Sequence, residues 1–401
     1  MNTLQIRKES NALAWFFALT YMVSYITRIN FGAVIAEMVT ETGMARADLA
    51  LSLTGSFITY GLGQIVSGMC GDRFSPKKLV AYGLGATTVM NALIPLCTSP
   101  YHMLIVWSLN GFAQAFLWPP MVRLMTAQMS PEEYSHLVVR VSWGSSFGTI
   151  LIYLLSPVFI TLSGWRCVFL FSAVCGAGML LIWLRCCRDS SPEFKASKTR
   201  TTSHGGMVLL SPTMLCVMVT IILQGMLRDG VTTWMPSYIA QTYSLNNQTA
   251  ILTGVILPLF AIISLQATSW LYRKRFTNPL LCMAVIFAVG AISSVALRLF
   301  SGSAATLSVL FSALLTGAMH GANLIQTGII PAFFREYGNV ATVSGILNSC
   351  TYIGSAISTY GIAVLSETIG WSDTLVLWAL IAAVGMILCL ACTRAWKCRF
   401  S

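Results

Sequence analysis

Three arginines lie within long apolar stretches of the sequence: Arg28, Arg123 and Arg228. A guanidinium stays protonated and presents a planar pair of N–H groups, which match the oxygens of a phosphate or a carboxylate. Arg28 and Arg228 each stand about two-thirds of the way along their stretch, where a charge is costly and marks a functional position. We predict that both bind an anionic substrate. Arg123 follows Trp118-Pro-Pro and is interpreted as a structural or gating contact.

Asp229, the residue after Arg228, offers two other interpretations. The first is a structural ion pair with Arg228. Neighbouring residues of a helix point about 100° apart, so we expect this neutralisation to be weak. The second is a role as the carboxylate that binds a coupling proton. Glu37, another carboxylate in an apolar stretch, is expected at the outer end of its segment.

Uncharged polar side chains recur at helical spacing in the same stretches, for example Tyr60, Gln64 and Ser67. The larger Tyr, Gln and Asn groups are interpreted as lining a substrate cavity, whereas the Ser and Thr groups fit helix packing. For His320, a packed position is the first interpretation and ligand binding is the second. The candidate substrate-binding residues beside the two arginines are Tyr25, Gln64, Gln114, Tyr153, Gln224, His320, Asn323, Asn348 and Tyr352.

The composition shows which solvent these stretches require. Of 401 residues, 56% are hydrophobic and 9% are charged, and the mean hydropathy is +0.74. A soluble protein has about 25% charged residues, so a soluble fold is excluded. The net charge of +11 is spread between apolar blocks, which is typical of a membrane-topology signal and not of a nucleic-acid-binding domain.

Apolar blocks long enough to cross a bilayer occur twelve times, six on each side of one polar stretch. We predict an all-α membrane protein with two pseudo-symmetric six-helix bundles, residues 1–187 and 208–401, joined by a cytoplasmic linker over 188–207. The first block lacks a cleavage site of small residues and is expected to be a transmembrane helix, not a signal peptide. The blocks lie at about 12–38, 48–70, 79–98, 102–127, 137–162, 166–187, 208–241, 249–271, 279–299, 303–334, 339–365 and 371–393.

Lysine and arginine fall almost entirely on one side of this topology. The opposite side has only Arg46, Arg166 and Arg298. Cytoplasmic loops contain the excess of positive charge. We therefore expect a multi-pass protein of the cell (inner) membrane with both termini in the cytoplasm.

The two halves repeat short motifs at a near-constant offset. Asp72-Arg-Phe-Ser corresponds to Lys274-Arg-Phe-Thr, Val141-Ser142 to Val343-Ser344, and Gly164-Trp165 to Gly370-Trp371, at offsets of 202, 202 and 206 residues. Internal repeats of this kind are typical of transporters that bind substrate at the repeat interface near the bilayer midplane.

The segment Gly68-Met-Cys-Gly-Asp72-Arg73-Phe-Ser-Pro-Lys77-Lys78 resembles the loop signature of the major facilitator superfamily, G-x-x-x-D-R followed by basic residues. The resemblance implies the major facilitator fold and alternating access, with Asp72 and Arg73 as a conformational latch. Asp72 is also a candidate for contact with a neighbouring helix N-terminus, where carboxylates are stabilised. The alternative is a solvated loop pair that only sets the topology.

Three further segments are similar to spans 1, 7 and 4 of the organophosphate:phosphate antiporters, a family that includes the glycerol-3-phosphate and hexose-phosphate transporters. The resemblance implies that Arg28 and Arg228 hold the phosphate of a substrate. Ile29 and Gln64 stand where the family often has lysine, and Trp143-Gly-Ser-Ser-Phe-Gly148 lacks its histidine, so the pocket is less positive. The similar segments are Tyr25-Ile-Thr-Arg28-Ile-Asn30-Phe31, Leu227-Arg228-Asp-Gly230-Val-Thr-Thr-Trp234-Met-Pro236-Ser-Tyr238, and Asn110-Gly-Phe-Ala-Gln114 with Trp118-Pro-Pro-Met-Val-Arg123.

Three hypotheses follow. The first is a secondary active transporter of a small organic anion, a phosphate ester exchanged for inorganic phosphate. The second is a proton-coupled symporter of a carboxylate such as a sugar acid, and the third is a transporter-like substrate sensor. We expect no enzymatic activity, no metal and no cofactor, because no catalytic motif or metal-ligand spacing is present. The expected partners are the anionic substrate, inorganic phosphate as counter-substrate and the lipid bilayer, without nucleic acid, and the protein is expected to work as a monomer.

Overall fold

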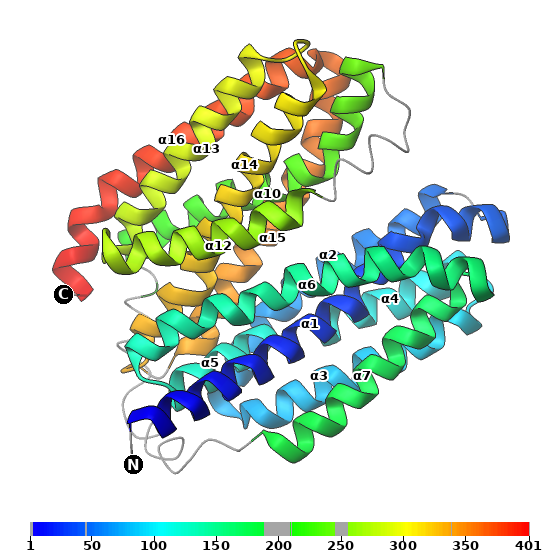
Figure 1. Ribbon diagram of the computed structural model, residues 1–401, viewed down its shortest axis with the longest axis horizontal. Coiled ribbons are helices and arrows are strands. Elements are labelled where there is room, and N and C mark those ends of the chain that lie inside the picture. The colour runs from blue at the N-terminus through cyan, green and yellow to red at the C-terminus, as the bar shows by residue number, and fades with distance from the viewer. Residues whose placement is uncertain are drawn as a thin grey trace. The chain divides into compact units, whose positions relative to one another are not determined.

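The computed structural model describes residues 3–44, 46–187, 209, 211–244, 256–337 and 339–400, and within them the chain forms helices and no strands (Figure 1). Each of the twelve predicted blocks overlaps a helix or a broken helix. The predicted linker over 188–207 lies outside the described residues. The helices are α1 (Thr3–Thr42), α2 (Arg46–Arg73), α3 (Pro76–Leu93), η1 (Ile94–Leu96), α4 (Pro100–Gln114), α5 (Trp118–Gln128), α6 (Pro131–Ser163), α7 (Arg166–Cys186), α10 (Pro212–Tyr243), α12 (Ile256–Lys274), α13 (Pro279–Leu299), α14 (Ala305–Asn323), η3 (Leu324–Ile329), η4 (Ile330–Phe334), α15 (Val340–Thr368) and α16 (Gly370–Phe400).

Several helices begin at a Ser-Pro or Asn-Pro pair. The polar side chain accepts a hydrogen bond from a backbone N–H of the first turn, and proline fits the first helical position because it has no N–H that needs a partner. At the start of α6, Ser130 and Glu133 form a complete capping box. The other caps of this kind are Ser75 for α3, Ser99 for α4, Ser211 for α10 and Asn278 for α13.

The fourth predicted span is broken in the structure, between α4 and α5 at residues 115–117. Pro119 and Pro120 have no N–H to donate to the carbonyls four residues earlier, so the helix cannot continue through them. One of these carbonyls belongs to Ala115, and the side chain of Gln64 in α2 donates a long hydrogen bond of 3.5 Å to it. Gln64, a candidate for substrate binding, thus satisfies a backbone group that the prolines leave without a helical partner.

The tenth span changes its winding after α14. Its next segment, η3, is a π-helix, and η4 is a 3₁₀-helix that contains Pro331. Pro331 again removes a helical donor. Short π-helical segments occur frequently at functional sites, and Asn323, a predicted site residue, directly precedes this one.

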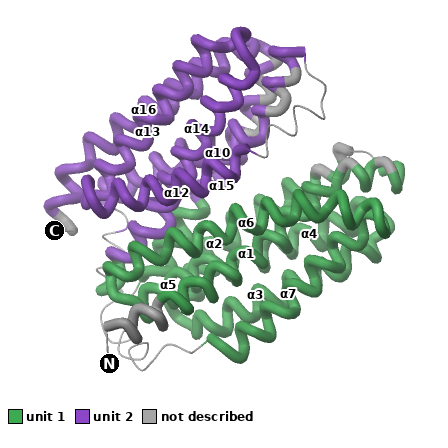
Figure 2. The backbone as a smooth tube through the Cα atoms, in the orientation of Figure 1, with its two compact units in different colours: residues 1–202, 334–349 green, residues 203–333, 350–401 purple. Residues whose placement is uncertain are grey.

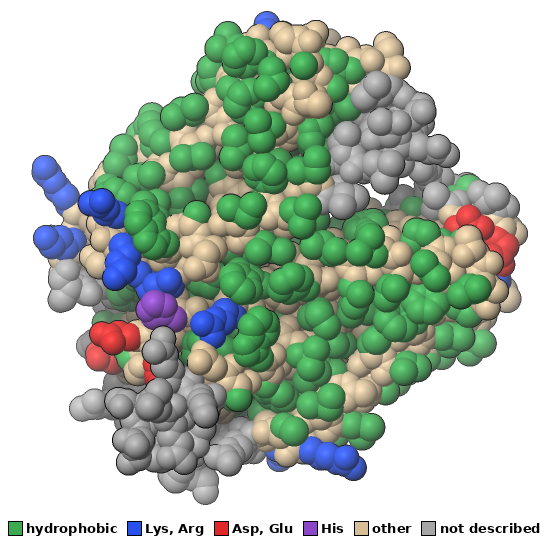
Figure 3. Space-filling view, viewed as in Figure 1, with side chains coloured by type: hydrophobic (Ala, Val, Ile, Leu, Met, Phe, Trp, Pro, Cys, Tyr) green, Lys and Arg blue, Asp and Glu red, His purple; other side chains and the backbone are tan. Residues whose placement is uncertain are grey.

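Apolar side chains cover most of the described face in Figure 3. Leu162, Val174, Ile292 and Leu299 are between 69% and 73% exposed. A soluble surface rarely exposes contiguous apolar patches of this extent. Within the described residues, nine helices are long and apolar enough to cross a bilayer, so the chain is a multi-pass membrane protein whose exposed apolar surface faces lipid.

Contacts divide the chain into two compact units (Figure 2). Unit 1 comprises residues 1–202 and 334–349, and unit 2 comprises residues 203–333 and 350–401. Residues 334–349, which the sequence places in the C-terminal bundle, therefore cluster with unit 1. Within unit 1, α1 packs on α6 and α7, α2 on α4, and α3 on α7; within unit 2, α13 packs on α14 and α16, and α10 on α14 and α16.

In unit 1, α6 approaches the arginine-bearing helix α1 at two glycines. A β-carbon at Gly144 would collide with the carbonyl oxygen of Ala18, and one at Gly148 with that of Met22. Small residues allow the backbones of membrane helices to approach closely. Met22 lies six residues before Arg28, so this contact fixes the depth and the rotation of Arg28.

Unit 2 repeats this contact between α10 and α15. A β-carbon at Gly354 would collide with the carbonyl oxygen of Ile222, and one at Gly225 with that of Thr351. Ile222 lies six residues before Arg228. Each unit therefore holds its arginine at the same distance along the chain from a contact between two helix backbones.

Gly354→Ala is expected to destabilise the protein by about 1–3 kcal/mol, because the added methyl group forces α10 and α15 apart. Gly361→Ala in the same helix is the control, since none of the described atoms lies within 4 Å of its β-carbon position. Thermal unfolding of both variants in detergent measures the difference. Equal melting temperatures would contradict the close contact.

Candidate functional site

In unit 1, Arg28 of α1 lies against two tyrosine rings. Its guanidinium carbon is 4.3 Å from the ring centroid of Tyr25 and 4.7 Å from that of Tyr60. Such cation–π contacts stabilise a desolvated guanidinium by about 2 kcal/mol. Carboxylates and phosphates bind the N–H groups of a guanidinium in its plane. The two rings therefore stabilise the charge of Arg28 within the apolar helix bundle.

Aromatic packing continues from these rings to α5. The ring of Tyr21 lies 5.1 Å from that of Tyr25, edge to face, and 4.6 Å from that of Trp118. Tyr60 comes from α2 and is 4% exposed. It is not among the candidate substrate-binding residues, although its ring is among the groups interpreted as lining a cavity and its spacing of four residues from Gln64 places both on one helix face. That spacing was the available signal.

In unit 2, Arg228 and Asp229 of α10 form a bidentate ion pair. Arg228 Nε donates to Asp229 Oδ1 over 2.6 Å, and Nη2 donates to Oδ2 over 2.7 Å. The prediction of a weak pairing between these neighbours is therefore wrong. The arginine side chain has enough rotatable bonds to turn sideways along the helix surface, and a poorly solvated guanidinium gains strongly from a paired carboxylate.

Two further side chains accompany this pair. Ser355 of α15 donates a hydrogen bond to Asp229, and His320 of α14 interacts electrostatically with both Arg228 and Asp229. The structure thus brings three of the predicted site residues together. They come from two helices, and a third helix supplies the serine.

Gln224 and Asn323, two more candidates, lie together in unit 2. Gln224 donates to the carbonyl oxygen of Met319 over 3.0 Å, and Asn323 donates to Gln224 Oε1 over 3.4 Å and to the Thr351 hydroxyl over 3.5 Å. Gln224 precedes Arg228 by one helical turn. These bonds connect α10, α14 and α15 one helical turn before Arg228.

Gln114 belongs to a buried polar network of unit 1. Its amide donates to the hydroxyls of Thr27 and Thr87, both over 2.8 Å. Asn110 accepts a hydrogen bond from Thr87 over 2.5 Å and donates to the Thr27 carbonyl over 3.2 Å. The network joins α1, α3 and α4 at the residue before Arg28, so Gln114 holds the arginine-bearing helix in place.

The other candidates have different surroundings. Tyr153 of α6 is 49% exposed, and Arg73 at the end of α2 is exposed as well. Asn348 is buried in the part of α15 that clusters with unit 1. Tyr352 is half-buried one turn later, in the part that belongs to unit 2. Their roles stay predictions.

Asp72 lies at the end of α2 and contacts the start of α15, within unit 1. Its carboxylate accepts hydrogen bonds from the backbone N–H of Ala341 over 3.0 Å and of Thr342 over 2.7 Å. Arg123 of α5 pairs with the same carboxylate over 2.9 Å, and the Asp72 side chain is 8% exposed. A carboxylate at a helix N-terminus complements the helix dipole, so Asp72 joins three helices and is not a solvated loop residue.

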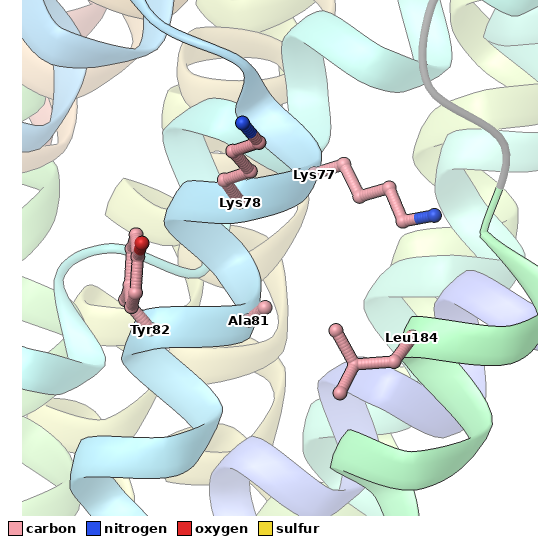
Figure 4. A pocket seen from close by; sticks show the side chains of 5 residues that line it. All are labelled: Lys77, Lys78, Ala81, Tyr82 and Leu184. Carbon is pink, nitrogen blue, oxygen red and sulfur yellow. The ribbon is translucent and has the colours of Figure 1, made fainter.

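A hollow of about 360 Å³ lies on the surface between α3 and α7 (Figure 4). It contains none of the residues predicted to bind substrate. Its lining residues are Lys77, Lys78, Ala81, Tyr82 and Leu184.

Residues 17–359 match the family model of the Major Facilitator Superfamily. The chain belongs to this superfamily. This major facilitator protein is 25% identical to the membrane sensor protein UhpC of Salmonella typhimurium over 395 residues, which cover 93% of this chain and 89% of that protein. It is 22% identical to a probable hexose phosphate transport protein of Chlamydia pneumoniae over 406 residues, which cover 92% of this chain and 88% of that protein.

The fold matches a solved structure of the proton:xylose symporter XylE with a TM-score of 0.76, over 97% of this chain and 98% of that chain. The identity is 10%, so this likeness concerns the fold alone. The predicted all-α major facilitator fold and the resemblance to the hexose-phosphate transporters are confirmed. The chain is a transporter-family membrane protein and not an enzyme.

Tyr60→Leu is expected to destabilise the protein by about 1–2 kcal/mol, because Arg28 loses one of its two rings. Tyr60→Phe keeps the ring and is expected to be nearly as stable as the wild type. Thermal unfolding of the purified variants in detergent measures both stabilities. An equal loss in the two variants would assign the effect to the hydroxyl group instead of the ring.

Asp72→Asn is expected to destabilise the protein by about 3 kcal/mol, because it leaves the poorly exposed Arg123 without its counter-charge. The variant with both Asp72→Asn and Arg123→Gln removes both charges and is expected to recover part of the loss. Thermal unfolding of the wild type, both single variants and the double variant gives a double-mutant cycle for Asp72 and Arg123. Additive losses would show that the two residues are not coupled.

Proposed function

We propose that this protein is a secondary active transporter that moves a small organic anion across the cell membrane by alternating access. The proposal rests on one observation. Each compact unit has an arginine in an apolar helix, Arg28 or Arg228, six residues beyond an equivalent glycine contact. Charges within membrane helices are retained for ligands and ion pathways, and guanidinium groups suit ligands with several oxygens.

Within this class, the substrate that we propose is a phosphate ester, exchanged for inorganic phosphate. A relative that spans most of this chain is named as a probable hexose phosphate transport protein. Inorganic phosphate presents the same oxygens as the phosphate group of an ester. Either one can therefore bind to the arginines in turn, as an exchanger requires.

The contacts of Asp72 supply a conformational latch for this cycle, together with Arg73 and Arg123. Opening breaks two hydrogen bonds between the carboxylate and the first turn of α15. The same bonds form again on closing. The predicted orientation places this end of α2, both termini and the linker between the two six-helix bundles in the cytoplasm.

A second candidate is a proton-coupled symporter of a carboxylate such as a sugar acid. The ion pair between Arg228 and Asp229 favours it, because a neutralised guanidinium leaves less positive charge for a doubly charged phosphate. Asp229 is then the candidate for the coupling proton.

Phosphate counterflow in proteoliposomes distinguishes these possibilities. Uptake of labelled phosphate that requires internal phosphate and ignores a pH gradient is the expected result. Carboxylate uptake driven by a proton gradient, without phosphate counterflow, would favour the symporter. Ligand binding without flux would favour a sensor, the role named in the relative UhpC.

Arg28→Lys and Arg228→Lys are each expected to abolish counterflow, because lysine lacks the planar pair of donors that holds an oxyanion. The control is Arg298→Lys, at an exposed residue at the end of α13, which should transport normally. The measurement is the rate of phosphate counterflow in each variant, compared with the rate in the wild type. Retained transport in both site variants, with the protein folded, would disprove the proposal.

A further inference from the structure

Asp229 occupies one of the paired sets of N–H donors through which Arg228 can bind an anion. Its two oxygens accept from Nε and Nη2 over 2.6 and 2.7 Å, which is the paired geometry that guanidinium groups form with carboxylates and phosphates. We propose that Asp229 is a resident counter-anion, which the substrate displaces from Arg228 and which sets the charge preference of the site. This inference rests on the proposed function, because it requires that Arg228 binds the substrate.

The structure indicates which partner moves. The side chain of Arg228 is 12% exposed, whereas that of Asp229 is 31% exposed. The two residues are neighbours in α10, so rotation of one side chain separates them without any movement of the helix. Ser355 of α15 also donates a hydrogen bond to Asp229, and this hydroxyl remains as a partner for the displaced carboxylate.

The two arginines differ in this respect. The guanidinium carbon of Arg28 lies 4.3 and 4.7 Å from the ring centroids of Tyr25 and Tyr60. Arg228 instead donates to a carboxylate. The displacement of a resident anion is therefore assigned to Arg228 in unit 2.

A displaced Asp229 stays close to the bound ligand, because it is the next residue along the helix. Coulomb energy scales with the product of the two charges, so Asp229 repels a doubly charged ligand twice as strongly as a singly charged one. Removal of the carboxylate should strengthen the binding of every anion, and of dianions most.

The test uses two six-carbon ligands of different charge, gluconate and glucose 6-phosphate, with the full-length protein in lipid nanodiscs at pH 8. Asp229→Asn is expected to lower Kd about tenfold for gluconate and about 100-fold for glucose 6-phosphate. Without ligand, this variant should melt at a lower temperature than the wild type, because Arg228 has lost its counter-charge. Saturating glucose 6-phosphate should restore the melting temperature.

Ser355→Ala is the matched control, because it removes a hydrogen bond from Asp229 and keeps both charges. It should change the two Kd values by the same factor. Asp229→Ser provides a second removal of the carboxylate, for the case in which the asparagine amide distorts the site. Failure of both Asp229 variants to fold with saturating glucose 6-phosphate would overturn the proposal, because a displaceable anion can be replaced by a ligand.

The two proposals fail in different ways. If the wild type binds anions through Arg28 and Arg228 but the Asp229 variants keep its ratio of Kd values, Asp229 is only structural and the proposed function stands. If neither ligand binds to the wild type or to the variants, the anion-transport function and this inference are both wrong.

Discussion

Water is absent from the apolar interior of a bilayer, so polar groups in a span are stabilised by partners within the protein or by a water-filled cavity. The main features of the structure follow from this constraint. Prolines interrupt the fourth span, and Gln64 bonds to a carbonyl that they leave without a helical donor. The amide of Gln114 is satisfied by two threonine hydroxyls. Arg228 is neutralised by the residue beside it, and Arg28 is covered by aromatic rings.

Glycine contacts determine where these groups lie. In each unit, the helix with the arginine touches a partner helix backbone to backbone, α1 against α6 and α10 against α15. Contacts of this kind tolerate no extra methyl group, so they fix both the rotation and the depth of the helices. Helix packing thus sets the equivalent positions of Arg28 and Arg228. The repeated motifs in the two halves of the sequence reflect this shared packing.

The sequence alone predicts much of this structure. Apolar periodicity predicts the helices, and the cost of charge in lipid selects Arg28 and Arg228. The same reasoning does not find the contact of Tyr60 with Arg28 or the hydrogen bonds of Gln114 to two threonines, and it is wrong for the pair of Arg228 and Asp229. Periodicity shows which residues share a helix face but not which neighbouring face they meet. The angle of about 100° between adjacent residues of a helix also does not account for the flexibility of the arginine side chain, which can turn toward the next residue when its charge is poorly solvated.

The pairing of adjacent residues in α10 has an electrical consequence. When one guanidinium charge crosses the full membrane potential, its free energy changes by about 2.3 kcal/mol for every 100 mV. Arg228 and Asp229 form a dipole with no net charge, so a displacement of α10 with the pair intact does almost no work against that potential. When an anion replaces Asp229, the same helix gains the charge of its ligand, and only then does the voltage act on its movement.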